Sequence, residues 1–330
     1  MFLKEKADDA SDSDVGSLPR GAFQRVLARQ AVWISIGAAF LVFDLIVAIG
    51  WIFGGGLKSV TVDADTVPTR IKVAAWAFQA LVLCLVGVLA ARGVRAWRRT
   101  RELSLEAATG LGLLTVAFQD VLCNYSGVPN SQYNPYYLNV ASWGPWIPGW
   151  NSSHPAGTQP EPLVVVGLGY LMVLPVAWCI IGFMKSLKKY RPGMGKLSNL
   201  ALGFVFFLVL DVLLEVFLVW GTGAYIYPHG IRSLSVFSGH WYQLGLNTVA
   251  ALAVLCVGTA QLLMSVEGND SSFVERFPPD AASRFPAGVR LLACVGYVNA
   301  LMFVVVVIVG FTNGLWGGPA PADIPGYFPK

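Results

Sequence analysis

The stretch LALGFVFFLVLDVLLEVFLVWG (200–221) is long and apolar enough to cross a lipid bilayer as one helix. Seventeen Leu, Phe and Val residues between positions 197 and 221 favour insertion by about 0.3 to 0.6 kcal/mol each. Asp211 and Glu215 oppose insertion by roughly 2.5 to 3.5 kcal/mol each. Because the two effects nearly cancel, both carboxyl groups are expected to face neighbouring helices or water rather than lipid.

The whole chain has the composition of a membrane protein. Of its 330 residues, 55% are hydrophobic and 13% are charged, against roughly a quarter charged in soluble domains. We therefore predict an all-α polytopic helix bundle, multi-pass in the cell membrane, whose outer surface contacts the lipid bilayer. Runs of about 20 apolar residues, the length of a membrane-spanning helix, occur seven times, near 31–53, 71–92, 104–123, 162–184, 197–221, 241–264 and 288–312.

The distribution of Lys and Arg predicts the orientation, because these residues are retained on the cytoplasmic side. The N-terminal tail and the second, fourth and sixth connections hold 18 of the 23 basic residues, whereas 124–161 holds none. The prediction is an N-in, C-out chain. Its parts are a disordered cytoplasmic tail (1–30), a membrane domain (31–312) with an extracytoplasmic aromatic loop (124–161), and an irregular extracytoplasmic tail (313–330).

Several classes of protein are disfavoured by composition. The N-terminal apolar run is too long and begins too late for a cleavable signal peptide. The five cysteines lie in five different spans with no paired spacing, so we predict neither a disulfide framework nor a zinc site. The excess of basic residues lies at predicted cytoplasmic helix ends, where anionic lipid head groups account for it. We therefore expect no nucleic-acid partner, and the sequence does not indicate a protein partner.

Polar residues within the spans gather in the predicted outer half of the membrane. Asp44, Asp120, Asp211 and Glu215 share this level with amide side chains, so we expect a polar cavity that opens outward. Asp211 and Glu215, four residues apart, lie on one helix face. Two carboxyl groups that close resist double ionisation, so one should keep its proton beside an ionised neighbour. This is the equipment of general acid–base catalysis.

A structural role for these acids is the competing interpretation. A single acid such as Asp44 can serve only to accept hydrogen bonds from a neighbouring helix. Tryptophans near a membrane surface are usually interfacial anchors, and the three histidines are expected in extracytoplasmic segments. Asp120, Asp211 and Glu215 together, at one level under one loop, favour a functional cluster.

The outer loop 124–161 is too long for a passive connection. It contains seven aromatic residues, many Asn and Ser residues and no basic residue. This composition fits a lid that packs aromatic faces over an apolar, uncharged small molecule. An aromatic cap lying on the bilayer surface is the alternative.

An ordered series of motifs resembles a known family. FQDVLCNY (118–125), YNPYYLN (133–139), SWGPWIPGW (142–150), PEP (160–162), DVLLE (211–215), GAYIYP (223–228) and LSVFSGHWYQ (234–243) together look like the spirocyclase AveC-like family of actinobacterial membrane proteins. The resemblance spans roughly residues 115 to 245. It implies a cofactor-independent cyclase or dehydratase of secondary metabolism. Such an enzyme closes a spiroketal from an apolar, polyketide- or lipid-like hydroxyketone, or dehydrates it.

The resemblance and the composition of the outer loop together give the expected roles. Asp120, Asp211 and Glu215 are the expected catalytic acids, with no metal ligand among them. The expected substrate-binding residues are Asn124, Tyr125, Tyr133, Asn134, Trp143, Trp146, Tyr225, Tyr227, Tyr242 and Gln243. One departure from the family pattern concerns the segment after Tyr-Gln. Phe-Pro and an acidic residue follow there in the family, whereas LGLNT (244–248) follows here, which leaves one acid fewer near the site.

Other functions use the same buried carboxyl groups. A proton-coupled transporter needs access from both sides, yet the predicted cytoplasmic halves of the helices are almost wholly apolar, and no inverted repeat is visible. A rhodopsin-like receptor has the opposite orientation, and the last span has no Lys for retinal. A lipid-binding or scaffold protein remains an alternative if the acids are structural.

Overall fold

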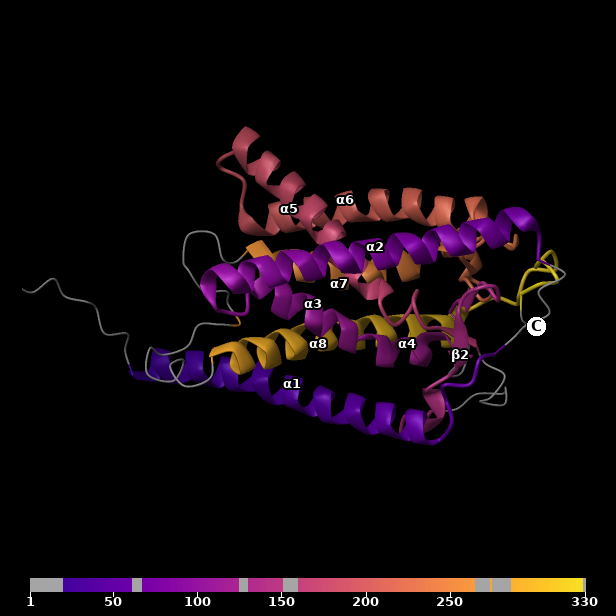
Figure 1. Ribbon diagram of the computed structural model, residues 1–330. Coiled ribbons are helices and arrows are strands. Elements are labelled where there is room, and N and C mark those ends of the chain that lie inside the picture. Colours follow the sequence, from indigo (N-terminus) through magenta and orange to yellow (C-terminus); the bar gives the residue numbers. More distant parts are fainter. Residues whose placement is uncertain are drawn as a thin grey trace, which may run out of the picture.

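The computed structural model describes residues 20–60, 67–124, 130–150, 160–264, 274 and 286–328. Within these residues, seven helical spans are long and apolar enough to cross a membrane, which confirms the predicted all-α membrane bundle. Figure 1 shows them as a single bundle. The spans comprise α1 (Arg20–Phe53), α2 (Thr69–Thr100), α3 (Leu105–Thr115) with α4 (Ala117–Asn124), η4 (Gly169–Met172) with α5 (Val173–Tyr190), α6 (Lys196–Val216) with η5 (Phe217–Gly221), α7 (Leu246–Met264) and α8 (Pro286–Trp316).

The helix ends differ from the sequence prediction at several places. α1 begins at Arg20, so residues 20–30, assigned above to the disordered tail, belong to the first helix. They are mostly Arg, Ala, Leu and Gln, which favour helix. α2 runs on through the basic segment to Thr100 because no Pro interrupts it. The fourth and sixth spans begin later than predicted, at Gly169 and Leu246. The apolar residues just before them belong to turns and a short strand.

The helix α8 lies at the centre of the packing, against α1, α3, α4 and α7. Small residues allow the closest approach: a Cβ atom built on Gly37 of α1 would lie 1.9 Å from the backbone oxygen of Leu292. A Cβ atom on Gly296 of α8 would lie 2.0 Å from the backbone oxygen of Trp33. Glycines at both positions therefore permit backbone-to-backbone contact, the usual device for helix association in lipid.

The third span is broken between α3 and α4. α3 starts with Ser104 as its N-cap, whose side chain accepts a hydrogen bond from the Ala107 N–H. It stops at Thr115, whose hydroxyl donates to Gly112 O at 2.7 Å and accepts from Asn299 Nδ2 of α8. α4 begins at Ala117, directly after Val116, whose backbone is still right-handed helical. Asp120 lies one helical turn after this interruption.

Three short two-stranded ladders lie in the connections at one end of the bundle, where Figure 1 also shows the C-terminus. β1 (Gln132–Tyr133) pairs with β4 (Tyr225–Ile226), β2 (Asn139–Ala141) with β3 (Pro160–Pro162), and β5 (Ser235–Val236) with β6 (Leu244–Gly245), all antiparallel. A 3-10 turn, η2 (Gly144–Trp146), follows β2, and another, η6 (Arg232–Leu234), precedes β5. The first ladder joins connections from two different parts of the chain.

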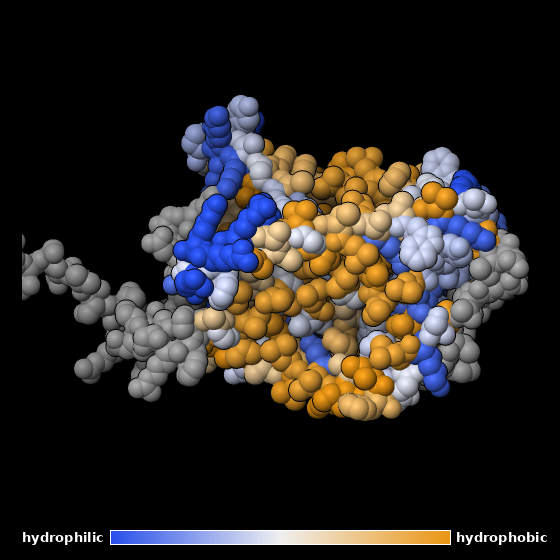
Figure 2. Space-filling view, in the orientation of Figure 1, coloured by the Kyte–Doolittle hydropathy of each residue, from blue (hydrophilic) through white to orange (hydrophobic). Residues whose placement is uncertain are grey.

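The surface fits a bundle in lipid. Figure 2 shows an apolar band between two hydrophilic ends. Large apolar side chains are exposed on α1, α2, α6 and α8. One end carries the basic residues in the C-terminal part of α2 and in the α5–α6 connection. The positive-inside rule predicts that this end is cytoplasmic.

Candidate functional site

Asp120 is the centre of a buried hydrogen-bonded cluster. Its Oδ1 accepts a hydrogen bond from the Tyr170 hydroxyl of η4 at 2.5 Å. Its Oδ2 accepts from the Tyr133 hydroxyl at 2.9 Å and from Asn124 Nδ2 at 2.5 Å. Three donors from three elements therefore fix one carboxyl group. The i, i+4 spacing on α4 brings Asn124 beside it.

Glu215 of α6 forms a second cluster of the same kind. Its Oε1 accepts from the Tyr225 hydroxyl at 2.7 Å and its Oε2 from the Tyr227 hydroxyl at 3.0 Å. Both phenols follow the short connection after η5 and return onto the last turns of α6. Asp211 lies one helical turn earlier, and its Oδ2 has no hydrogen-bond partner among the described residues.

The β1–β4 ladder holds the two clusters together. Its register places Tyr133 opposite Tyr225 and Gln132 opposite Ile226. The rings of Tyr133 and Tyr225 meet edge to face with centroids 6.1 Å apart, and those of Tyr225 and Tyr227 with centroids 5.6 Å apart. Since Tyr133 bonds Asp120 and Tyr225 bonds Glu215, a continuous line of aromatic rings connects the two carboxyl groups.

Both clusters line one cavity of about 230 Å³. Asp120, Asp211 and Glu215 all contribute to its wall, so the structure brings together the three acids predicted from the sequence. The apolar part of the wall comes from α5, α6, α7 and α8 and includes Val173, Val176, Phe207, Leu252, Met302 and Val305. A cavity with apolar walls and a few convergent polar groups is the usual form of a small-molecule site.

An amide network anchors the polar end of this cavity. Asn130 Oδ1 accepts from the Thr248 hydroxyl at 2.8 Å and from Asn313 Nδ2 at 3.0 Å. Asn247 Nδ2 donates to Asn313 Oδ1 at 2.9 Å, and Ser131 Oγ donates to Asn124 Oδ1 at 2.5 Å. The loop residues that border the cavity are thereby tied to α4, α7 and α8.

The phenols outside the spans are held as hydrogen-bond donors. Burial raises the pKa of Tyr133 well above its usual range, and the nearby charge of Asp120 raises it further. Burial likewise raises the pKa of Tyr225 and of Tyr227, with the charge of Glu215 as the next cause. Each phenol therefore keeps its proton at neutral pH and donates it to a carboxyl oxygen.

Glu161 is a buried acid close to the site that the sequence analysis did not single out. It lies on β3 with no exposed surface. Its Oε1 accepts from Ser142 Oγ at 3.0 Å, and its Oε2 has no partner among the described residues. Burial raises its pKa well above the usual range, and the charge of Asp120 raises it further, although the Ser142 hydrogen bond lowers it. Glu161 does not line the cavity.

The two residues that sequence reasoning missed differ in the signal they gave. Glu161 is the only acid in a loop without basic residues, and it belongs to the PEP motif, so its position offered a signal. Tyr170 offered no such signal, because it lies in an apolar stretch where a Tyr is an ordinary helix residue. Only the turn of η4 shows that Tyr170 reaches Asp120.

Of the ten predicted substrate-binding residues, four line the cavity: Asn124, Tyr133, Tyr225 and Tyr227. Tyr125 lies outside the described residues. Two others, Asn134 and Gln243, hold the backbone around the cavity. Asn134 Nδ2 donates to Gly223 O at 2.8 Å, and Gln243 Nε2 donates to Tyr227 O at 2.8 Å.

The remaining three aromatic residues do not line the cavity. Trp143 packs edge to face on Trp51 of α1, with centroids 5.8 Å apart. Trp146 lies so close to α1 that a Cβ atom on Gly50 would meet its ring at 2.3 Å. Tyr242 stacks on His240, with centroids 5.1 Å apart. The η2 part of the loop therefore packs beside α1 rather than over the cavity, since α1 offers it an apolar face with small residues.

Other polar residues of the spans connect helices and loops. Gln79 Oε1 accepts from the Leu138 N–H at 2.9 Å, and Gln119 Nε2 donates to Asn299 Oδ1 at 2.8 Å. Asp44 is buried, and both its oxygens lack a partner among the described residues. It does not line the cavity. No three His, Cys, Asp or Glu residues in the described ranges are grouped so that they would hold a metal ion.

A family model described as Spirocyclase AveC-like matches residues 97–330. The chain belongs to the spirocyclase AveC-like family. Among the residues that line the cavity, only Phe78 lies outside the AveC-like match. Family membership indicates a cyclase-type enzyme in general terms. Comparison with curated proteins found no match, and neither did comparison with solved structures.

Proposed function

We propose that this AveC-like protein is a membrane enzyme that cyclises an apolar hydroxyketone by acid–base catalysis, closing a spiroketal or dehydrating the product. The observation that carries the proposal is the pair of tyrosine-bound carboxyl clusters, from different spans, that line one cavity together with Asp211. Family membership supports the cyclase class. The apolar wall supports the polyketide- or lipid-like substrate class.

The proposed reaction is balanced without an oxidant or reductant. One hydroxyl of the substrate adds to its protonated carbonyl carbon, loses its own proton to the enzyme and gives a hemiketal. Protonation of the hemiketal hydroxyl then releases water and leaves an oxocarbenium ion. The second hydroxyl attacks that carbon and loses its proton. The net change is from a dihydroxyketone to a spiroketal and one water molecule, and the proton returns to the enzyme.

The hydrogen bonds support a different proposed role for each of the three acids. Both oxygens of Asp120 and both of Glu215 accept from neighbouring donors, the pattern of a carboxylate that takes up a proton or stabilises a cation. Asp211 has an oxygen with no partner among the described residues. We assign proton donation to Asp211, proton removal to Glu215 and stabilisation of the oxocarbenium ion to Asp120.

The cavity volume limits what enters. About 230 Å³ is less than the roughly 300 to 1,000 Å³ of drug-sized ligand pockets. The cavity would therefore hold only the reacting segment of an apolar substrate. The rest of the substrate would extend along the neighbouring helices. A folded substrate with its two hydroxyls near one carbonyl gains most from such confinement.

The test uses purified protein in detergent and a synthetic apolar ketone that carries one hydroxyl on each arm. Spiroketals also form without an enzyme in acid, so rate and stereochemical purity are measured at neutral pH by chromatography and mass spectrometry. Asp211→Asn and Glu215→Gln should each lower the rate by about 10²- to 10⁴-fold. Asp44→Asn makes the same chemical change to a buried acid outside the cavity and should leave the rate unchanged.

Two outcomes would contradict the proposal. Full activity in both Asp211→Asn and Glu215→Gln would remove these residues from the mechanism. Proton flux into vesicles that depends on the ketone, without conversion of the ketone, would instead show the proton-coupled transporter that shares the buried acids.

A further inference from the structure

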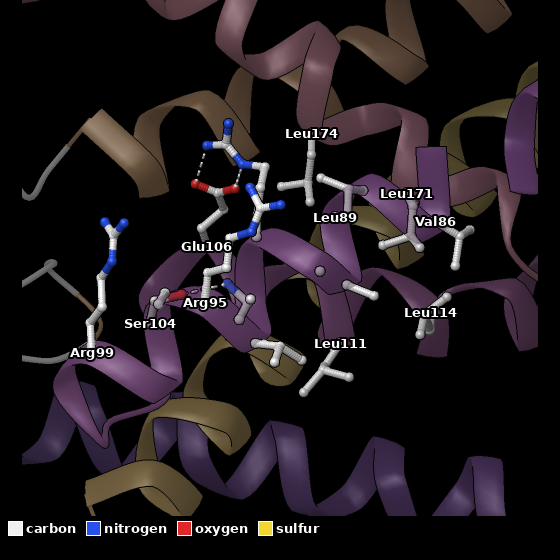
Figure 3. Close-up of a pocket in the computed structure, with 17 residues that line it drawn as sticks. Val86, Leu89, Arg95, Arg99, Ser104, Glu106, Leu111, Leu114, Leu171 and Leu174 are labelled. Atoms are coloured by element: carbon white, nitrogen blue, oxygen red, sulfur yellow. Dashed lines mark hydrogen bonds and ion pairs between the residues drawn. The ribbon is translucent and has the colours of Figure 1, made fainter. Parts of the chain in front are cut away.

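A second and larger cavity lies at the basic end of the bundle. Its volume is about 650 Å³, and it is bounded by the end of α2, the start of α3 and the η4–α5 segment. It shares no lining residue with the cavity that holds the acids. Figure 3 shows its side chains, with leucines at one end and charged groups at the other.

The charged end of this cavity has an excess of positive charge. Arg92 is paired with Glu106 at 3.1 and 3.3 Å, and its guanidinium lies 4.7 Å from the centre of the Trp178 ring. Arg95 and Arg99 also line the cavity, and neither has a carboxylate partner among the described residues. Three arginines and one glutamate give a formal charge of +2 in the lining.

The other end of the cavity is apolar and has room for an extended chain. Val86, Leu89, Leu111, Leu114, Leu171 and Leu174 form its wall. Glycine keeps the space open at Gly93, where an added Cβ atom would meet only the Cβ of Ala107, at 3.6 Å. Arginines and an aliphatic wall in one cavity match the two parts of an amphiphile.

We propose that this cavity binds an anionic phospholipid. Arg95 and Arg99 hold the phosphate, and one acyl chain lies along the leucines. The positive-inside rule predicts that this end faces the cytoplasmic leaflet, which carries the anionic lipids that basic pockets between spans recognise. A soluble phosphate would use only the charged end, and a zwitterionic lipid would gain little from two unpaired arginines. The proposal does not depend on the proposed cyclase reaction.

The test measures lipid binding by native mass spectrometry of purified full-length protein. The protein is titrated with phosphatidylglycerol, phosphatidylcholine or soluble glycerol phosphate. We expect phosphatidylglycerol to bind at least about tenfold more tightly than phosphatidylcholine. The Arg95→Gln/Arg99→Gln protein should lose about fivefold in affinity per arginine, or about 25-fold in total. The neighbouring pair Arg98→Gln/Arg101→Gln removes the same charge outside the cavity lining and should change affinity by no more than about twofold.

A variant that fills the cavity separates a specific site from general attraction. Gly93→Leu keeps every charge and improves helix propensity, but it places a side chain in the cavity. It should therefore abolish tight binding of phosphatidylglycerol. Three outcomes would overturn the proposal: equal losses in the two arginine pairs, full binding in Gly93→Leu, or equally tight binding of glycerol phosphate. Circular dichroism confirms that each variant is folded.

Discussion

At the scale of single residues, the site depends on tyrosine hydroxyls that bind carboxyl oxygens. Tyr133 and Tyr170 bond Asp120, and Tyr225 and Tyr227 bond Glu215. In a buried site, each such bond fixes a rotamer and satisfies a group whose burial is otherwise costly. The phenols thus replace the basic partners that buried acids often have.

Removing one phenol hydroxyl should leave Glu215 less firmly positioned while the aromatic ring still fills its place in the cavity wall. Tyr225→Phe keeps the ring that packs on Tyr133 but leaves Oε1 of Glu215 without its 2.7 Å bond. We expect the catalytic rate to fall about 10- to 100-fold, as for loss of a hydrogen bond to a charged group, with little change in KM. Steady-state kinetics measure both values. Tyr136→Phe, the same change at a residue outside the cavity lining, is the control.

The burial of Glu161 predicts that the stability of the folded protein depends on pH. Its pKa is raised in the folded state because it is buried, so its destabilising effect is absent below the unfolded pKa near 4.5 and grows as pH rises. The melting temperature of the wild-type protein should match that of Glu161→Gln at about pH 4 and fall below it at about pH 8. Melting curves in detergent across this range test the prediction. A constant difference at all pH values would contradict it.

At the scale of elements, short strands and broken helices position the acids. Asp120 follows the break between α3 and α4, and the β1–β4 ladder joins its cluster to that of Glu215. Such two-residue ladders are marginal by themselves. Side-chain bonds to the backbone stabilise this one: Asn134 Nδ2 bonds Gly223 O, and its Oδ1 accepts from the Tyr136 N–H at 2.9 Å.

Loss of the Asn134 side chain should therefore loosen the ladder. Asn134→Ala removes both bonds and leaves a buried backbone oxygen unpaired, which should destabilise the protein by about 1 to 3 kcal/mol and lower the catalytic rate as well. Thermal melting and rate measurements on the same sample test this. Ser186→Ala removes an exposed hydroxyl that bonds Gly182 O and should change the free energy of unfolding by less than about 0.5 kcal/mol. A normal rate in Asn134→Ala would show that the ladder does not position the acids.

At the scale of the whole molecule, the sequence predicted the spans well and the outer loop poorly. Hydrophobic length alone located seven helices, because the bilayer imposes one length on all of them. Depth in the membrane was enough to group Asp120 with Asp211 and Glu215. The positions of Trp143 and Trp146 depended on contacts with α1, about 90 residues away in sequence. No local pattern encodes such contacts.

The predicted orientation can be tested with reporter fusions at two positions. Alkaline phosphatase fused after Lys330 should be active, since it folds only outside the cytoplasm, and green fluorescent protein at the same point should be dark. Fusions after Arg191 should give the reverse result. Phosphatase activity after Arg191 would show that the topology is opposite to the predicted one. The basic cavity would then face the outer leaflet.

The packing of α1 has a consequence for what counts as the minimal protein. The ring of Trp146 is seated on Gly50 and Gly54, and Gly37 touches the backbone of α8, yet all three glycines precede the matched region that starts at residue 97. A fragment that starts at residue 97 would lack α1. It would expose the part of the α8 backbone that contacts Gly37, and Trp146 would lose its contacts with Gly50 and Gly54. The first span therefore supports the packing of the half that holds the acids, and we do not expect it to be dispensable.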